Sequence, residues 1–378
     1  MQFTNSQALI PQGTYAKKLR PLLPAEAFLP DPTKLVILFI NLTILVLGWM
    51  IASHLDSWSI YLLWLYLPIA IIMGNSVMSL AVSCHDLMHG TVIRNSRLIH
   101  WITLLGLTML WMPPTLWKVV HNRVHHNKTN SLDDPDRNYL YEQPNTWSKW
   151  FYHQFLPSFD VNPIRLVVGM GTVWGYYAFR NLTSVLFFNG QSVDYLPASF
   201  RVSAKERWAI AGEFFVMLMI HLSILVYLQF DPLKLILSYF LPIGIGYAVL
   251  IFYIYTHHLI SPMTSVNDPL LNSVSIRVPK IVDLLHLNFS YHTEHHIFPG
   301  MNSDYYPMVQ ELLKIHYPDR FNLLSAGEAW HLLLTTPRSY KDENTLTDWS
   351  GKMSVPCPVK MPNDKESVKT SSSMTVEI

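Results

Sequence analysis

An all-α integral membrane protein is the fold class that this sequence predicts, and three observations support it. Half of the 378 residues are apolar and only 14% are charged, whereas soluble domains average about 25% charged residues. Four long segments carry almost no charge and could cross a membrane as helices. Eight of the 17 histidines fall into three short clusters, which indicates a polar site beside the apolar helices.

The four apolar segments predict four transmembrane helices. The first has 18 residues, and at about 1.5 Å per residue it would be roughly 27 Å long, close to the thickness of a hydrocarbon core. A short polar turn separates it from the second segment, and a tight turn joins the third to the fourth. The predicted spans are residues 35–52, 60–83, 208–228 and 235–255.

Two further apolar segments are predicted not to span. Residues 98–112 are short for a span, and one crossing here would place the first two histidine clusters on opposite faces. This segment is therefore expected to re-enter or to lie in the interface. Residues 164–188 contain Arg165 and Arg180, which predicts an interfacial amphipathic helix.

The charge distribution predicts that both termini are cytosolic. Lys and Arg gather in the inner segments, while the two outer turns contain only Lys234. Residues 1–34 are interpreted as a cytosolic lead-in, and residues 35–337 as the multi-pass membrane domain. The polar residues 338–378 are predicted to form a disordered tail.

Composition also narrows the class of partner and site. The net charge is +1, and no basic stretch is interleaved with aromatic residues, so nucleic acid is not an expected partner. The two cysteines, Cys84 and Cys357, are far apart in sequence, which argues against a disulfide framework and a cysteine metal motif. A bound metal would therefore be held by histidines and carboxylates.

Three motifs, HDLMH, HNRVHH and HTEHH, contain the clustered histidines. They are His85 and His89, then His121, His125 and His126, then His292, His295 and His296. On a helix, positions i and i+4 share one face about 5 to 6 Å apart, which suits two ligands on one metal or on adjacent metals. The adjacent histidines at 126 and 296 are expected to point about 100° away, toward a second metal. Because one ion cannot use eight imidazoles, the count predicts a di-metal site in a helical cap on the cytosolic face.

Imidazole suits zinc, copper, nickel and iron alike, so the ligand type does not name the metal. The position of the clusters restricts the kind of substrate and reaction that the site fits. A site at the membrane surface with apolar helices beneath it suits a substrate with a long hydrocarbon chain. Oxidation of an unactivated C–H bond requires a redox metal and dioxygen, and two irons can share that oxidation.

The segments HDLMHG, HNRVHHNKTN and YHTEHHIFP resemble the three histidine boxes of the membrane-bound fatty acid desaturase family, and the resemblance extends over about residues 35–330. It implies four transmembrane helices and two iron ions at the cytosolic face, with all eight box histidines as iron ligands. A further ligand in the family comes from the end of the fourth span. His257 occupies that place here with His258 as its neighbour, and His286 is a second candidate.

The spacing within the boxes resembles that of acyl-lipid desaturases and carotenoid ketolases. Three residues separate the histidines of the first box and precede the histidine pair of the second, unlike the stearoyl-CoA type. His292 stands where front-end desaturases have Gln, and no His-Pro-Gly-Gly haem motif is present. The resemblance therefore implies a separate electron donor, a ferredoxin or a cytochrome.

Carboxylates in or just after the boxes are candidates to orient the ligands. Four carboxylates, those of Asp86, Glu294, Asp134 and Asp136, could accept the second ring N–H of a ligand histidine and so fix its tautomer.

The function that this resemblance implies is that of an oxidoreductase, a dioxygen-dependent acyl desaturase. It would introduce a double bond into a fatty acyl lipid substrate with two electrons from the donor. One alternative uses the same di-iron centre for hydroxylation or ketolation of alkyl chains or carotenoids. An alternative of another class is a zinc-binding membrane receptor or hydrolase, or a metal transporter, but these place ligands within or between spans and need more spans than four.

Overall fold

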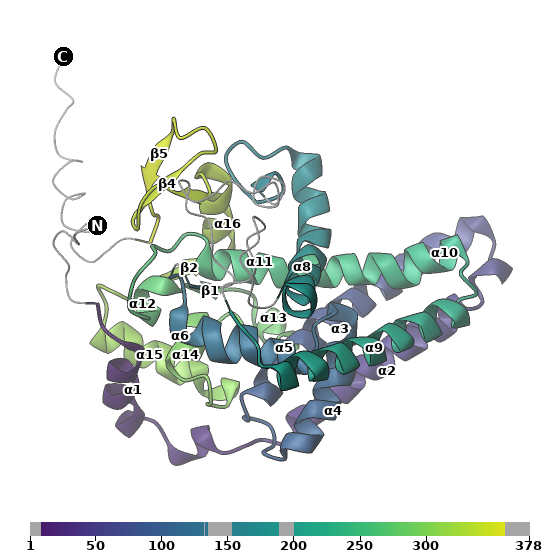
Figure 1. Ribbon diagram of the computed structural model, residues 1–378, viewed down its shortest axis with the longest axis horizontal. Helices are drawn as coiled ribbons and strands as arrows, with labels where there is room; N and C mark the ends of the chain where they lie inside the picture. The colour runs from purple at the N-terminus through teal and green to yellow at the C-terminus, as the bar shows by residue number, and fades with distance from the viewer. Residues whose placement is uncertain (1–8, 132, 135–152, 189–199, 360–378) are drawn as a thin grey trace.

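A computed structural model describes residues 9–131, 133–134, 153–188 and 200–359. Within these residues the chain is mostly helical, and four helices are long and apolar enough to cross a membrane. They are Lys34–Ala52 (α2), Ile60–Met88 (η4, Ile60–Leu65, then α3, Tyr66–Met88), Ala204–Tyr227 (α9) and Pro232–His258 (α10, Pro232–Leu235, then η7, Ile236–Phe240, then α11, Leu241–His258). Each one coincides with a predicted span, and together they form the bundle that extends to the right in Figure 1.

The centre of the bundle is the close contact between α3 and α11. A Cβ atom on Gly246 of α11 would lie 2.6 Å from Val77 Cβ and 3.0 Å from the carbonyl oxygen of Gly74 on α3. Two helices can approach this closely only where the side chain between them is a hydrogen atom. The glycines therefore allow α3 and α11 to pack in direct contact.

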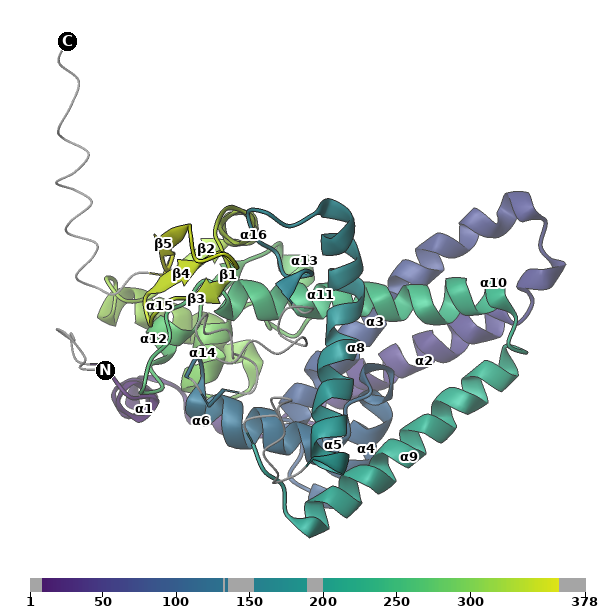
Figure 2. The same cartoon turned by 45° about the horizontal axis from the view of Figure 1, so that its top comes forward.

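A fifth long helix, α8 (Pro163–Phe187), runs across α11 instead of along the bundle (Figure 2). It begins at Asn162, whose side chain accepts from the backbone N–H groups of Ile164 and Arg165. At the crossing, a Cβ on Gly171 would be 3.7 Å from the carbonyl oxygen of Gly244 in α11. The helix predicted from residues 164–188 is present, and its place in the membrane interface stays a prediction.

The segment between the first two histidine clusters reverses direction. It contains α4 (Ser96–Gly106) and the short turn η5 (Thr108–Leu110), after which Trp111 adopts a positive φ of 53°. The rings of His89 and His121, on either side of the segment, have centroids 5.6 Å apart. The chain therefore returns to the end of the bundle from which it started, as the sequence predicts.

The remaining elements form a cap at the end of the bundle where the histidines lie (Figure 1). The cap helices are α1 (Gln12–Leu19), η1 (Arg20–Leu22), η2 (Ala25–Phe28), α5 (Pro114–Trp117), η6 (Lys118–His125), α6 (His126–Lys128), α12 (Pro269–Asn272), α13 (Lys280–Leu285), α14 (His292–Ile297), η8 (Ser303–Tyr305), α15 (Tyr306–His316) and α16 (Ala326–Thr335). At the opposite end, η3 (Leu55–Ser57) follows α2. A parallel pair of strands, β1 (Ser275–Arg277) and β2 (Leu323–Ser325), joins two parts of the cap with Ser275 opposite Leu323.

The prediction of a disordered tail from residue 338 is wrong for residues 338–359. Three antiparallel strands form there in the order β3 (Ser339–Tyr340), β4 (Thr345–Thr347) and β5 (Ser354–Pro356), with Tyr340 opposite Leu346. Arg338 is 1% exposed and donates to the carbonyl oxygens of Pro157 and Leu333. The segment is ordered by backbone and arginine hydrogen bonds to the rest of the chain, which a polar composition does not reveal. Residues 360–378 lie outside the described part.

We predict that Gly246→Ala destabilises the protein, because the new methyl group would meet Val77 and the backbone of α3. Overpacking of this kind costs about 1–3 kcal/mol and should lower the midpoint of thermal unfolding in detergent. Gly212→Ala in α9 is the matched control, since no atom beyond the neighbouring backbone of its own helix lies within 4 Å of the Cβ position there. Equal midpoints for the two variants would contradict the close packing of α3 and α11.

Candidate metal centre

Nine buried or half-buried histidines converge where the cap meets the bundle. They come from four places in the chain: the C-terminal end of α3, the segment η6–α6, the last residue of α11, and α14. All three clusters from the sequence are included, so the structure brings together all eight box histidines.

The nine side chains form two adjacent groups. The five-histidine site consists of His85, His89, His121, His126 and His295, and the four-histidine site consists of His125, His258, His292 and His296. Within each group one ring nitrogen per residue lies within 4.8 Å of all the others. The two groups touch, since the ring centroids of His126 and His296 are 4.8 Å apart.

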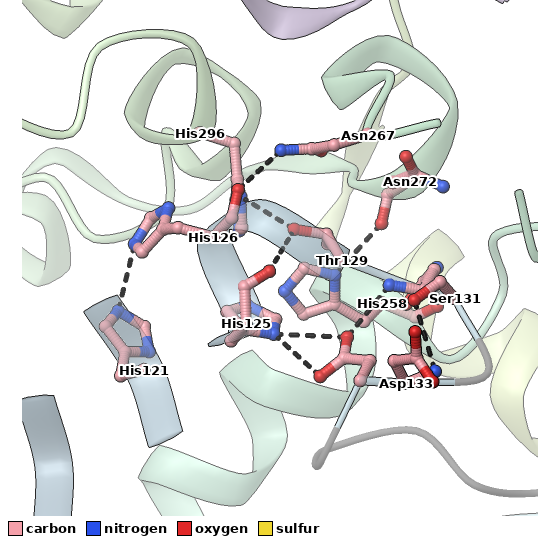
Figure 3. A network of polar contacts seen from close by, with 12 residues as sticks. His121, His125, His126, Thr129, Ser131, Asp133, His258, Asn267, Asn272 and His296 are labelled. Atoms are coloured by element: carbon pink, nitrogen blue, oxygen red, sulfur yellow. Dashed lines mark hydrogen bonds and ion pairs between the residues drawn. The ribbon is translucent and has the colours of Figure 1, made fainter. Parts of the chain in front are cut away.

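The three histidines of the second box are divided between the two sites differently from the prediction. His121 and His126, five residues apart, share the five-histidine site with their Nε2 atoms 3.1 Å apart (Figure 3), whereas His125 belongs to the other site. The reason is that Lys118–His125 is a π-helix, whose wider turn with i→i+5 bonding changes which residues share a face. In the third box His296 shares a site with His292, and His295 is the one that points to the other site.

The additional histidine at the end of α11 is His258, not the predicted His257. The Nε2 atom of His258 lies 2.7 Å from Nε2 of His292, while the ring of His257 stacks on the His292 ring at 4.1 Å without joining either group. His286 also lies outside both groups. Its ring contacts the Tyr253 hydroxyl at 3.0 Å and Asn75 Oδ1 at 3.1 Å.

Contacts on the outer ring nitrogens define how several of these histidines are oriented. Nδ1 of His258 lies 3.0 Å from the carbonyl oxygen of Asn272 (Figure 3). A carbonyl only accepts, so Nδ1 carries the proton and Nε2 presents its lone pair to the four-histidine site. Nδ1 of His295 is 3.0 Å from the hydroxyl of Tyr306, and this contact orients its ring toward the five-histidine site.

Two of the four candidate carboxylates contact a histidine ring as expected, and Asp136 lies outside the described residues. Asp86 Oδ1 is 3.2 Å from Nδ1 of His85, and both oxygens of Asp134 are 3.2 Å from Nδ1 of His125. Each carboxylate accepts the Nδ1 proton and leaves Nε2 directed inward. Glu294 has a different role, because its carboxylate accepts from Ser275 Oγ and from Gln310 Nε2, which ties α14 to β1 and α15. Burial raises the pKa of Glu294 to about 7.

The electrostatics of the two sites fit a metal. Burial, with smaller contributions from neighbouring imidazoles, holds the pKa well below 6.5 for His89, His121, His126, His292, His295 and His296. These rings are therefore neutral near pH 7, the form that binds metals. Nε2 of His85 and Nε2 of His89 are buried without a hydrogen-bond partner among the described residues, and such nitrogens are costly unless a cation uses their lone pairs. The donor set, imidazole nitrogens oriented by carboxylates and carbonyls, is one that iron binds.

An apolar cavity lies beneath both sites. It runs between α3, α5, α8 and α11, and aromatic side chains such as Trp117, Trp174 and Tyr177 line it. Histidines of both sites form part of the same wall, namely His85, His121, His125, His258 and His292. A long apolar ligand in this cavity would therefore lie against both groups of histidines.

The fold and the site define a class of protein: four membrane-span candidates, a capping layer, and two groups of histidines arranged as metal ligands above an apolar cavity. Similarity to a known family shows to which family of this class the chain belongs. The chain matches the family described as fatty acid desaturase over residues 62–323. Since the match covers more than half of its length, the chain belongs to the fatty acid desaturase family.

Two curated relatives carry the description "sn-1 acyl-lipid omega-3 desaturase (ferredoxin)". The protein from Synechocystis sp. (strain ATCC 27184 / PCC 6803 / Kazusa) is 30% identical over 138 residues, which cover 36% of each chain. The protein from Nostoc sp. (strain 36) is 29% identical over 199 residues, covering 51% of this chain and 48% of that one. The matches thus span about a third to a half of the relatives' lengths.

We predict that His286 makes stability depend on pH. Burial lowers its pKa from 6.5 to about 4, so between these values the unfolded chain binds a proton that the folded chain does not. The neutral His286 ring therefore contributes about 3 kcal/mol to the free energy of unfolding above pH 6.5. This contribution is lost as the pH falls toward 4. The thermal midpoint in detergent should therefore fall more steeply on acidification in the wild type than in His286→Gln. Parallel pH curves for the two proteins would contradict this assignment.

Proposed function

We propose that the protein is a fatty acyl desaturase that binds two irons in the five-histidine and four-histidine sites. The observation that carries this proposal is the apolar cavity whose wall contains histidines of both sites. A hydrocarbon chain is the ligand that such a cavity fits, because aliphatic and aromatic side chains gain free energy by excluding water from it. Family membership and the two acyl-lipid relatives support the same conclusion.

The chain's own residues would hold the metals, position the substrate and exclude water. The nine imidazoles of the two sites are the proposed ligands, which adds His258 to the eight box histidines and leaves out His257 and His286. Bound irons would supply the reduction of dioxygen and the oxidation of two neighbouring C–H bonds, with both oxygen atoms leaving as water. Trp117 and Trp174 would hold the acyl chain against the histidine wall, and the closeness of that contact selects the carbons that react.

The proposed partners follow from the same features. The relatives' description as acyl-lipid enzymes that use ferredoxin supports a membrane lipid as substrate and a separate ferredoxin as electron donor. We place the cap, both termini and the histidines on the cytosolic side. In support of this orientation, Lys234 is the one Lys or Arg among the described residues of the two outer turns, and it is 2% exposed and paired with Asp56.

Expression in a host whose lipids lack the product should test the reaction. We expect a new double bond in the host's acyl chains, detected by gas chromatography and mass spectrometry of fatty acid methyl esters. His125→Ala should reduce the product below detection, because it removes a proposed ligand, whereas His331→Ala, an exposed histidine of α16, should leave it unchanged. Hydroxylated chains or oxygenated carotenoids in place of unsaturated chains would contradict desaturation.

Iron analysis of purified variants should separate the two neighbouring histidines of α11. His258→Ala removes a proposed ligand, so the iron content should fall from about two per chain toward about one. His257→Ala removes a ring of similar size and burial that lies outside both sites, and we expect it to retain both irons. Zinc with little iron in the wild type would contradict the proposed centre altogether.

A further inference from the structure

A buried lysine at the start of the first span is connected to the five-histidine site. Lys34 is the first residue of α2 and is only 5% exposed. Its Nζ atom lies 2.6 Å from Ser303 Oγ and 3.2 Å from Asp304 Oδ1, on the cap segment η8. A buried ammonium group is costly unless it is paired, so these contacts give its position a physical reason.

The contacts continue from Ser303 to a proposed metal ligand. Ser303 Oγ is 3.0 Å from Asp86 Oδ2, and the other oxygen of Asp86 is 3.2 Å from Nδ1 of His85. The same carboxylate is 3.9 Å from Lys34 Nζ. The four side chains thus form a continuous path from Lys34 to His85, which we call the Lys34 relay.

The chemistry of lysine fixes the direction of every hydrogen bond in this relay. An ammonium group can only donate, so Ser303 Oγ accepts from Lys34 and its own proton is free to be donated to Asp86. Asp86 then accepts on both oxygens, from Ser303 and from Nδ1–H of His85. With the proton on Nδ1, the lone pair of His85 is on Nε2, which is buried, without a hydrogen-bond partner among the described residues, and directed into the five-histidine site.

We propose that Lys34 is a positioning residue which acts through Ser303 and Asp86 to hold His85 in the tautomer that binds metal. The proposal rests on the proposed metal centre and adds to it a residue remote from the histidines in sequence. It concerns one site only. At the four-histidine site, Asp134 has the corresponding place beside His125, and there a backbone N–H, that of Asn130 at 2.8 Å, donates to the carboxylate.

Two variants interrupt the relay at different points. Lys34→Met removes the ammonium group while keeping a long side chain, and Ser303→Ala removes the hydroxyl while keeping the charge. The purified proteins would be reconstituted anaerobically with ⁵⁷Fe(II), and both metal affinity and the Mössbauer spectrum would be measured. We expect the affinity of one of the two sites to fall about 10- to 100-fold, the usual effect of removing support behind a ligand, with the spectrum of the other iron unchanged.

Among the described residues the chain offers a matched control in a second buried lysine. Lys234 is 2% exposed at the opposite end of the bundle, where Nζ lies 2.8 Å from the carbonyl oxygen of Ser53 and 3.2 Å from Asp56. Lys234→Met should lower the thermal midpoint without changing iron affinity. Asp304→Asn removes an exposed partner of Lys34 but leaves the relay intact, so it should bind iron as the wild type does.

The outcomes separate this inference from the proposed function. If Lys34→Met and Ser303→Ala bind both irons with wild-type affinity and spectra, Lys34 has only a structural role and the inference is wrong. If Lys34→Met does not fold, Ser303→Ala alone decides between these results. His85→Ala tests the metal centre itself, and wild-type iron binding by that variant would overturn the proposed centre. If His85→Ala loses one iron while Lys34→Met binds iron as the wild type does, only the proposed role of the Lys34 relay is wrong.

Discussion

The structure depends on the burial of nine imidazole rings at one end of an apolar bundle. A buried polar group destabilises a protein unless each polar atom finds a partner, and nine such rings make that requirement severe. Protein groups satisfy the outer nitrogens of four of these rings: carboxylates beside His85 and His125, a carbonyl beside His258 and a hydroxyl beside His295. The inner nitrogens of each group face one another, and a bound cation would use their lone pairs.

The helices determine where this convergence can occur. Glycines at the contact of α3 and α11 bring the ends of two spans together, and those ends carry His85, His89 and His258. The second box then approaches from one side as a π-helix and the third from the other side as α14. Because α8 crosses the bundle at this level, its residues Trp174 and Tyr177 line the apolar cavity beneath the histidines. The position of the proposed metal ligands and that of the cavity are thus consequences of the same helix packing.

Features that depend on local pattern could be predicted from the sequence. The four spans follow from uncharged runs of sufficient length, and the grouping of eight histidines follows from their spacing. Features that depend on the rotation of a helix about its axis, or on contacts with residues distant in sequence, could not be predicted in this way. Whether His257 or His258 faces the site depends on how α11 is rotated about its axis. The side chains of α11 that line the cavity include Ile251, Ile254 and His258, which follow one another at helical spacing. This stripe is the signal that would have selected His258, but it is visible only once the cavity is known. The order of residues 338–359 depends likewise on contacts with distant carbonyls.

Support for the second and third histidine boxes comes from parts of the chain that local motifs do not mark. Asn267 donates to the carbonyl oxygen of His126, and the next residue, Asp268, accepts from Tyr15 and from Arg320 at 2.9 and 2.5 Å (Figure 3 shows Asn267). Gln12 of the same N-terminal helix donates to the carbonyl oxygen of Ile297 at the end of α14. These N-terminal residues, like Lys34, precede the region matched by the family, which begins at residue 62. The proposed ligands therefore lie within the matched region, while part of the structure that orients them lies outside it. A description of this centre that stopped at the histidine boxes would leave out the residues that hold two of them in place.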